Sequence, residues 1–199
     1  MDIVNLHYLP AIHFFAAIVK QEKIVIEHFD SFQKSTFRNK TAIATANGKL
    51  TLSIPIDGGR NNRELYRDVQ ISNIEKWQHK HYLAIVSAYQ NAPYFDFYID
   101  KFHPFYHTTQ HSLFEFNLGI FKLCLQLLKL DIPLSFSEDF MPKENHINQL
   151  NKENTLLQLP PNPRYIQVFE EKNGFISHLS ILDLLMNKGN TALRYLQEM

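Results

Sequence analysis

The chain has 199 residues, of which 45% are hydrophobic, enough to bury one well-packed core or two small ones. Twenty Lys and Arg residues balance twenty Asp and Glu residues, so the basic surface of a general nucleic-acid-binding protein is not expected. The single cysteine, Cys124, lies in an apolar run and has no partner for an intramolecular disulfide. We therefore expect a buried thiol and a reducing, cytoplasmic compartment.

No stretch reaches the roughly 18 consecutive apolar residues that indicate a membrane span. The opening residues lack the basic start and the small-residue cleavage site of a signal peptide. No internal repeat divides the chain. These observations predict one domain over residues 1–199.

The first thirty residues predict a strand–helix–strand unit. An apolar run over residues 2–6 suits a strand, and Pro10 suits the first turn of a helix over residues 11–20. The β-branched run Ile24–Ile26 then suits a short buried strand. This order is typical of a parallel sheet with a right-handed crossover. We predict an α/β fold with a mostly parallel sheet begun by this unit, a β-hairpin and flanking helices.

The hairpin is predicted from the alternation of residues 41–56 around Asn47-Gly48, a dipeptide that favours a type I′ turn. A loop over residues 57–62 and a strand over residues 68–72 are predicted next. They are followed by a helix that Asn73 caps and that runs to about Asn91, by helical turns interrupted at Pro104, and by a helix over residues 112–130. A strand over residues 132–136 and a weak helix or mobile connection over residues 138–158 come next. The last predicted elements are a strand over residues 165–169, which follows a proline-rich extended segment, a helix over residues 180–187 and a shorter helix after Gly189.

The densest polar segment, residues 27–40, directly follows the second predicted strand, and ligands of open parallel sheets gather at the carboxyl ends of strands. Glu27 and Asp30 could orient an amine or act as general bases. Lys34, Arg38 and Lys40 could hold a phosphate or a carboxylate. The alternative is a solvated loop with ordinary ion pairs.

Trp77 and His81 form a second candidate constellation, because residues four apart are neighbours on a helix. An aromatic wall beside an imidazole suits a site in which His81 acts as acid or base. The equally weighted alternative is that the indole anchors the helix to the core and the histidine caps it.

His103, His107, His111 and Glu115 are spaced by four residues, as in some metal sites, but Pro104 and the surrounding aromatic residues favour a packed amphipathic surface. No metal site is therefore predicted, although binding by His107 and His111 stays open. The chain also lacks the nucleophile-elbow, P-loop and dinucleotide-binding motifs. The sequence identifies no cofactor.

The order of residues resembles the WbqC-like family, in the branch whose opening ends in Tyr-Leu-Pro. The matching residues are Tyr8-Leu9-Pro10, Ile26-Glu27, the Lys34-Ser35-Thr36-Phe37-Arg38-Asn39-Lys40 stretch, Ala46-Asn47-Gly48, Leu52-Ser53-Ile54-Pro55, Lys76-Trp77-Gln78 with His81, Tyr89 with Ala92-Pro93 and Phe95, and the C-terminal segments Tyr165–Phe169 and Leu179–Leu185. Many members open with His-Gln-Pro before the Tyr-Leu-Pro triplet. Here Val4-Asn5-Leu6 stands at that place, so the leading histidine and glutamine are missing.

The family is associated with bacterial surface-polysaccharide gene clusters, and acyl or aminoacyl transfer to an amino sugar has been suggested for it. The resemblance implies an enzyme in which Tyr8, Lys34, Arg38, Asn39 and Trp77 bind a small molecule, such as a sugar nucleotide or acyl donor. Glu27, Asp30 or His81 would move a proton. The alternative is a non-catalytic binding or interaction protein that retains the fold, favoured by the altered opening and by the aromatic residues between positions 94 and 106, which suit a homodimer interface.

Overall fold

The computed structural model describes residues 3–58, 64–142 and 153–199. Its parallel sheet consists of β1 (Ile3–Asn5), β2 (Ile24–Glu27) and β5 (Leu134–Phe136), with β2 in the middle. Helix α1 (Ile12–Ile18) connects β1 to β2. Both β1 and β2 are buried along their whole length, as is typical of strands in a parallel sheet that is covered on both faces. The predicted mixed α/β fold and its strand–helix–strand opening are confirmed.

The predicted hairpin is also confirmed, as β3 (Lys40–Thr45) paired antiparallel with β4 (Gly48–Ser53). The predicted turn type is wrong. Thr45 pairs with Gly48, so Ala46 and Asn47 form the loop, and Asn47 does not take the positive φ that a type I′ turn needs. Gly48 takes it instead, with a φ of 94°, as glycine does in a bulge beside a hairpin loop.

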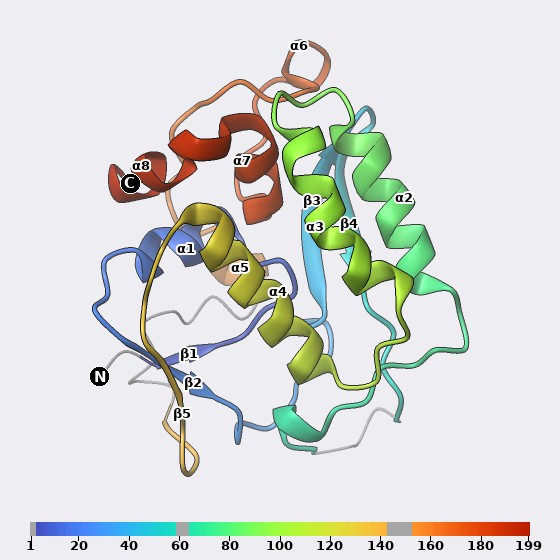
Figure 1. Ribbon diagram of the computed structural model, residues 1–199, viewed down its shortest axis with the longest axis vertical. Coiled ribbons are helices and arrows are strands. Elements are labelled where there is room, and N and C mark those ends of the chain that lie inside the picture. The colour runs from blue at the N-terminus through green and yellow to red at the C-terminus, as the bar shows by residue number, and fades with distance from the viewer. Residues whose placement is uncertain (1–2, 59–63, 143–152) are drawn as a thin grey trace.

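Three helices follow the hairpin: α2 (Trp77–Tyr89), α3 (Phe95–His107) and α4 (Leu113–Leu128). Helix α2 packs on β3, α3 lies side by side with α2, and α4 packs on α3 (Figure 1). Ser112 caps α4 by accepting a hydrogen bond from the Glu115 amide. Asn73 does not cap α2, because its side chain donates to the carbonyls of Ile71 and Gln110.

Pro104 does not interrupt α3, contrary to the prediction. It removes one backbone hydrogen bond from the helix interior. Phe102 and Tyr106, on either side of it, are both buried in the core. Burial of these two aromatic side chains outweighs the lost bond, so the helix runs through to His107.

Two predicted strands are absent. Residues 66–68 form the 3-10 helix η1 (Tyr66–Asp68), and the segment after it makes only isolated bridges, Ile56 with Ile71 and Gln70 with Ser112. Residues 165–169 run as an irregular segment rather than a strand. Neither apolar run finds a neighbouring strand long enough to form a ladder with it.

The C-terminal part contains the helices α5 (Glu153–Leu156), α6 (Glu170–Asn173), α7 (Ile181–Lys188) and α8 (Ala192–Gln197), and the 3-10 helix η3 (Gly189–Thr191). The two helices predicted there, over residues 180–187 and after Gly189, are thereby confirmed. Parts of the connection predicted over residues 138–158 and of the loop over residues 57–62 lie outside the described residues.

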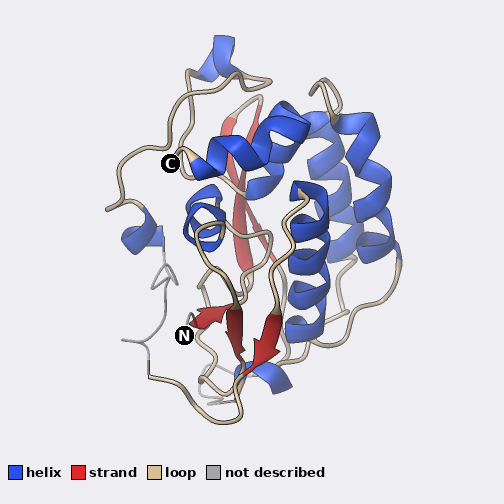
Figure 2. Cartoon of the chain, turned by 60° about the vertical axis from the view of Figure 1, so that its left-hand side comes forward, coloured by secondary structure: helices blue, strands red, loops and turns tan. Residues whose placement is uncertain are grey.

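One hydrophobic cluster extends from Val4 to Leu196 and includes buried Cys124, and Figure 2 shows the helices gathered around the hairpin beside the small sheet. That continuity supports the single-domain organisation that we propose. Among the described residues, no helix has the length and apolar character needed to cross a membrane.

Candidate functional site

The polar segment of residues 27–40 folds inward. Glu27, Asp30, Arg38 and Asn39 are buried, whereas Lys34 is exposed and donates to the carbonyl of Gly58. The four buried side chains therefore meet protein partners rather than solvent.

Asp30 and Arg38 form a buried ion pair, in which Arg38 Nη2 donates to Asp30 Oδ2. The same nitrogen donates to Asn5 Oδ1 at 3.0 Å, and Nη1 donates to the Ser31 carbonyl at 2.9 Å. The guanidinium also lies 4.8 Å from the ring centre of Tyr66. Both terminal nitrogens are thus engaged, and the fork that would clamp a phosphate or carboxylate has protein acceptors instead.

Asn117 of α4 joins this network, although the sequence analysis did not single it out. Its Nδ2 donates to the Arg38 carbonyl and to Tyr66 Oη, each at 2.7 Å. Tyr66 Oη in turn donates to the Leu6 carbonyl at 3.0 Å, and burial raises the pKa of this tyrosine. A lone asparagine between Phe116 and Leu118 on an apolar helix was the sequence signal for it.

The side chains of Glu27 and Asn39 form hydrogen bonds with backbone groups. Glu27 Oε1 accepts from the Phe29 amide at 2.5 Å, and Oε2 accepts from the Met141 amide at 2.7 Å. Asn39 Nδ2 donates to the Ile54 carbonyl at 3.1 Å. Both side chains therefore fix the course of loops around the sheet and the hairpin.

Tyr8, His81 and Tyr106 form a second buried network. Tyr8 Oη lies 2.9 Å from His81 Nδ1 and 2.9 Å from Tyr106 Oη. The imidazole also hydrogen-bonds the Ser53 backbone, which fixes its proton on the other ring nitrogen, so Tyr8 donates to Nδ1. Trp77 packs edge-on against His81 with ring centres 5.2 Å apart, and its indole N–H has no hydrogen-bond partner among the described residues.

Burial lowers the pKa of His81 to about 4, an effect that the hydrogen bond to the Ser53 backbone only partly opposes. His81 is therefore neutral at pH 7. It can accept a proton only weakly and cannot serve as a general acid at that pH. His81 does not line the cavity described next.

The cavity nearest the polar segment has a volume of about 270 Å³. We call it the 35–42 cavity, and it is lined by Ser35, Thr36, Phe37, Lys40, Thr41, Ala42, Thr51 and Glu153. Ala42 faces Thr51 across the hairpin, whereas their neighbours Ile43 and Leu52 point into the core. Ala42 and Thr51 thus line the cavity from the hairpin face opposite to Ile43 and Leu52, and none of the buried site candidates named above lines it.

Lys40 gives this cavity its unpaired charge, because among the described residues its ammonium has no ion-pair partner. Glu153 pairs with Lys49 at 2.8 Å on the rim. Ser35, at the edge of the cavity, has a φ of 61°, a strained value for a residue other than glycine. An ammonium beside hydroxyl groups and the Phe37 ring can hold an anionic, hydroxyl-rich small molecule.

In the described part of the chain, no group of three or more His, Cys, Asp or Glu side chains is placed to hold a metal ion. The His103 and His107 rings stack face to face with centres 3.4 Å apart, an arrangement in which their nitrogens do not converge. His111 lies beyond the end of α3.

Residues 6–159 match the WbqC-like protein family. The chain belongs to that family. It is 24% identical over 226 residues to an uncharacterised protein, Rv1507c, of Mycobacterium tuberculosis (strain ATCC 25618 / H37Rv), and the match covers 98% of this chain and 96% of that protein. No solved structure matches the chain.

The altered family opening has a structural place. Asn5 stands where many WbqC-like proteins have glutamine, and its side-chain oxygen accepts from Arg38. The amide at this position therefore belongs to the Asp30–Arg38 network. Val4, at the place of the family's histidine, is fully buried in the core.

Proposed function

We propose that this WbqC-like chain binds an anionic small molecule in the 35–42 cavity and acts as an acyl or aminoacyl transferase in surface-polysaccharide or cell-envelope biosynthesis. The observation that carries the proposal is Lys40, which lines that cavity and has no ion-pair partner among the described residues. A sugar nucleotide or an acyl donor supplies the matching negative charge and hydroxyl groups. The association of the family with polysaccharide clusters supports the pathway, and a cytoplasmic location suits such donors.

The buried residues have a supporting role in this proposal. Asp30, Arg38 and Asn117 hold the backbone that ends in Lys40, because Asn117 bonds the Arg38 carbonyl directly. The Tyr8–His81 network supports the hairpin from its other face. Any proton transfer would then fall to Glu27, Asp30 or His81 only after a rearrangement that exposes one of them.

The second candidate function is non-catalytic ligand binding, and the lack of convergence favours it. Asp30, Arg38, Glu27 and Asn39 already have protein partners, and His81 is neutral and enclosed. A homodimer remains part of this alternative, since Phe97 on α3 is 70% exposed and Leu83 on α2 is 52% exposed. Light scattering at several protein concentrations tests the dimer.

A thermal-shift screen with sugar nucleotides, acyl carriers and amino acids tests binding. A ligand at about a hundred times its dissociation constant should add roughly 2.7 kcal/mol to the free energy of unfolding. Lys40→Met should weaken the affinity by about tenfold or more, since hydrogen bonds to charged groups contribute about 1.5–3 kcal/mol. Lys122→Met, on the exposed side of α4, is the matched control and should not change the affinity.

Lys34→Met separates the cavity from the wider polar segment, because Lys34 is exposed and lies outside the cavity. Equal losses with Lys34→Met and Lys40→Met would contradict the assignment to the 35–42 cavity. Turnover of a bound donor with an amino sugar would distinguish the transferase from the binding protein.

A further inference from the structure

The wall of the 35–42 cavity that carries Glu153 is tied to the rest of the molecule by two histidines far away in the chain. Glu153 begins α5, and turn-forming hydrogen bonds continue after it, from Leu157 to Glu153, from Gln158 to Thr155 and from Leu159 to Leu156. Residues 153–159 therefore form one short helical unit. The carbonyl of Leu159, the last residue of this unit, and that of Pro160 next to it are bound by histidines.

His178 Nε2 donates to the Leu159 carbonyl at 3.2 Å, and His13 Nε2 donates to the Pro160 carbonyl at 3.0 Å. A carbonyl oxygen only accepts, so both imidazoles carry their proton on Nε2. The two rings lie stacked, with centres 4.8 Å apart and planes 8° from parallel. We call this pair the His13–His178 latch.

Both histidines are buried, each with only 8% of its surface exposed. His13 Nδ1 is enclosed and has no hydrogen-bond partner among the described residues. A proton added to this nitrogen would be a buried, unpaired N–H⁺ group beside a second imidazole. Burial lowers the pKa of His13, the bond to Pro160 opposes this, and His178 lowers the pKa further.

Charged groups from other elements border the same surface. Lys20 just after α1, Glu198 after α8 and the last residue, Met199, line the cavity that His13 also borders, and Glu198 is paired with Arg194 at 2.7 Å. Burial and the neighbouring imidazole therefore act against a protonated His13.

We propose that the His13–His178 latch holds the Glu153 wall of the 35–42 cavity closed at neutral pH and releases it when His13 is protonated in acid. The regulatory meaning of this release rests on the proposed function of the cavity. Release frees Lys49 from Glu153, so a second lysine without that partner stands at the rim of the opened cavity. Residues from Asn162 onward stay in place, because Asn162 is held by Ser177 and Tyr195, which do not titrate in this range.

An amide NMR titration of the full chain from pH 8 to pH 5 tests the latch without any ligand. The amide signals of Leu157, Gln158 and Leu159 should move together with the ring signals of His13, with one shared midpoint, while the Asn162 amide should stay unchanged. His13→Gln keeps a side-chain N–H donor for the Pro160 carbonyl but cannot titrate. It should reduce the movement of the three amides by half or more.

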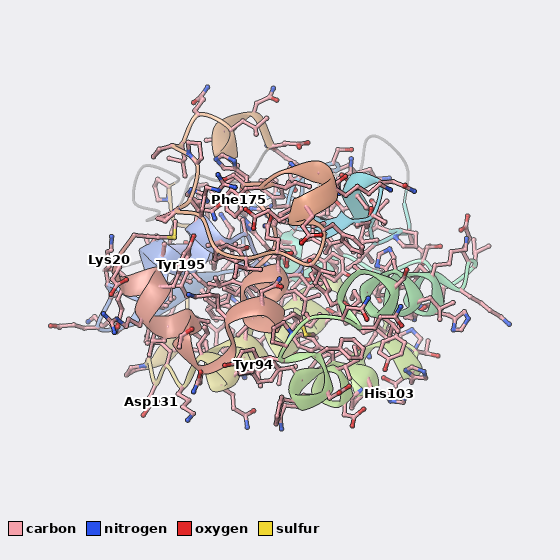
Figure 3. All side chains as sticks on the ribbon, turned by 90° about the horizontal axis from the view of Figure 1, so that it is seen from above. Lys20, Tyr94, His103, Asp131, Phe175 and Tyr195 are labelled. Atoms are coloured by element: carbon pink, nitrogen blue, oxygen red, sulfur yellow. The ribbon has the colours of Figure 1, made fainter. Side chains whose placement is uncertain are left out.

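His103→Gln is the matched control, since His103 belongs to another stacked pair, on α3 (Figure 3). Figure 3 places it on the opposite side of the molecule from Lys20 and Tyr195. This variant should leave the amide titration unchanged. Amides that do not move in the parent protein, or that move equally in His13→Gln, would overturn the latch.

Sulfate, whose charge is constant over this range, separates the latch from the proposed function. The affinity for sulfate, followed through the NMR signal of the Lys40 amide, should rise by about twofold or more in acid in the parent protein, because opening frees a second lysine. In His13→Gln the affinity should rise by less. If the three amides move but sulfate does not bind at either pH, the binding proposal fails and the latch stands.

Discussion

Replacing Asp183 by asparagine should make the stability of this protein less sensitive to pH. Asp183 lies on α7 and is almost completely buried. Its Oδ2 accepts from Tyr165 Oη at 2.6 Å and from Gln167 Nε2 at 3.0 Å. Tyr89 Oη is near enough to affect the pKa of Asp183, yet neither that hydroxyl nor Asp183 Oδ1 has a direct hydrogen bond among the described residues.

Burial raises the pKa of Asp183 from 3.8 to about 6, and the hydrogen bonds from Tyr165 and Gln167 only partly oppose this. The folded state therefore holds the proton more tightly than the unfolded state does. Stability from this group is present below the unfolded pKa and is lost as the pH rises through the folded pKa. The full loss is about 3 kcal/mol, of which about 2 kcal/mol falls between pH 4.5 and pH 7.5.

The asparagine side chain would not ionise, and its carbonyl oxygen can accept both existing hydrogen bonds while its amide nitrogen faces Tyr89. Relative to the parent protein, Asp183→Asn should thus gain about 2 kcal/mol between pH 4.5 and pH 7.5. Urea unfolding at both pH values measures this through the fluorescence of the single buried tryptophan, Trp77. Parallel pH profiles for the two proteins would refute the reasoning. Asp183→Ala, which leaves two donors unpaired, should be less stable at both pH values.

Three further predictions concern the buried groups. Asp30→Asn should lower the free energy of unfolding by about 3–5 kcal/mol in urea titrations, because it leaves the Arg38 guanidinium buried without a counter-charge. Tyr8→Phe should lower it by about 1–3 kcal/mol by the same measurement, since His81 Nδ1 and Tyr106 Oη lose their shared partner, and an unchanged value would contradict the network. Cys124 should not react with a thiol reagent until urea unfolds the chain, because the side chain is enclosed and burial raises its pKa; rapid labelling of the folded protein would contradict this.

Much of the fold could be predicted because its signals are local. The β-branched run at Ile24 is recognisable from its own composition, and the alternation around Gly48 belongs to two strands that are immediate neighbours in the chain. The runs over residues 68–72 and 165–169 show the same kind of composition but form no strand. A strand forms only beside a partner strand, and the composition of a segment does not show whether such a partner lies next to it. In the second run, Tyr165 and Gln167 turn to Asp183 instead.

The buried networks could not be predicted from local signals, because their members are far apart in sequence. Tyr8 and His81 are separated by 73 positions, and Arg38 and Asn117 by 79. The sequence shows which polar groups are present but does not show which of them form hydrogen bonds with one another. A dense polar segment can therefore mark either a solvated site or a set of groups that must be paired because they are buried.

Strand alternation separates these two cases better than polar density does. On β3, Ile43 faces the main core, so Thr41 shares its direction, whereas Lys40 and Ala42 face the opposite side of the hairpin, where Ala42 packs with Ala44 and Leu179. Thr41 accordingly donates to the Leu9 carbonyl at 2.8 Å, as an inward polar group must. Lys40, one residue earlier, is left on that opposite side with no ion-pair partner among the described residues. In the polar segment, it is thus the position of Lys40 on a strand, rather than its membership of a charged cluster, that makes it the best-placed residue to meet a ligand.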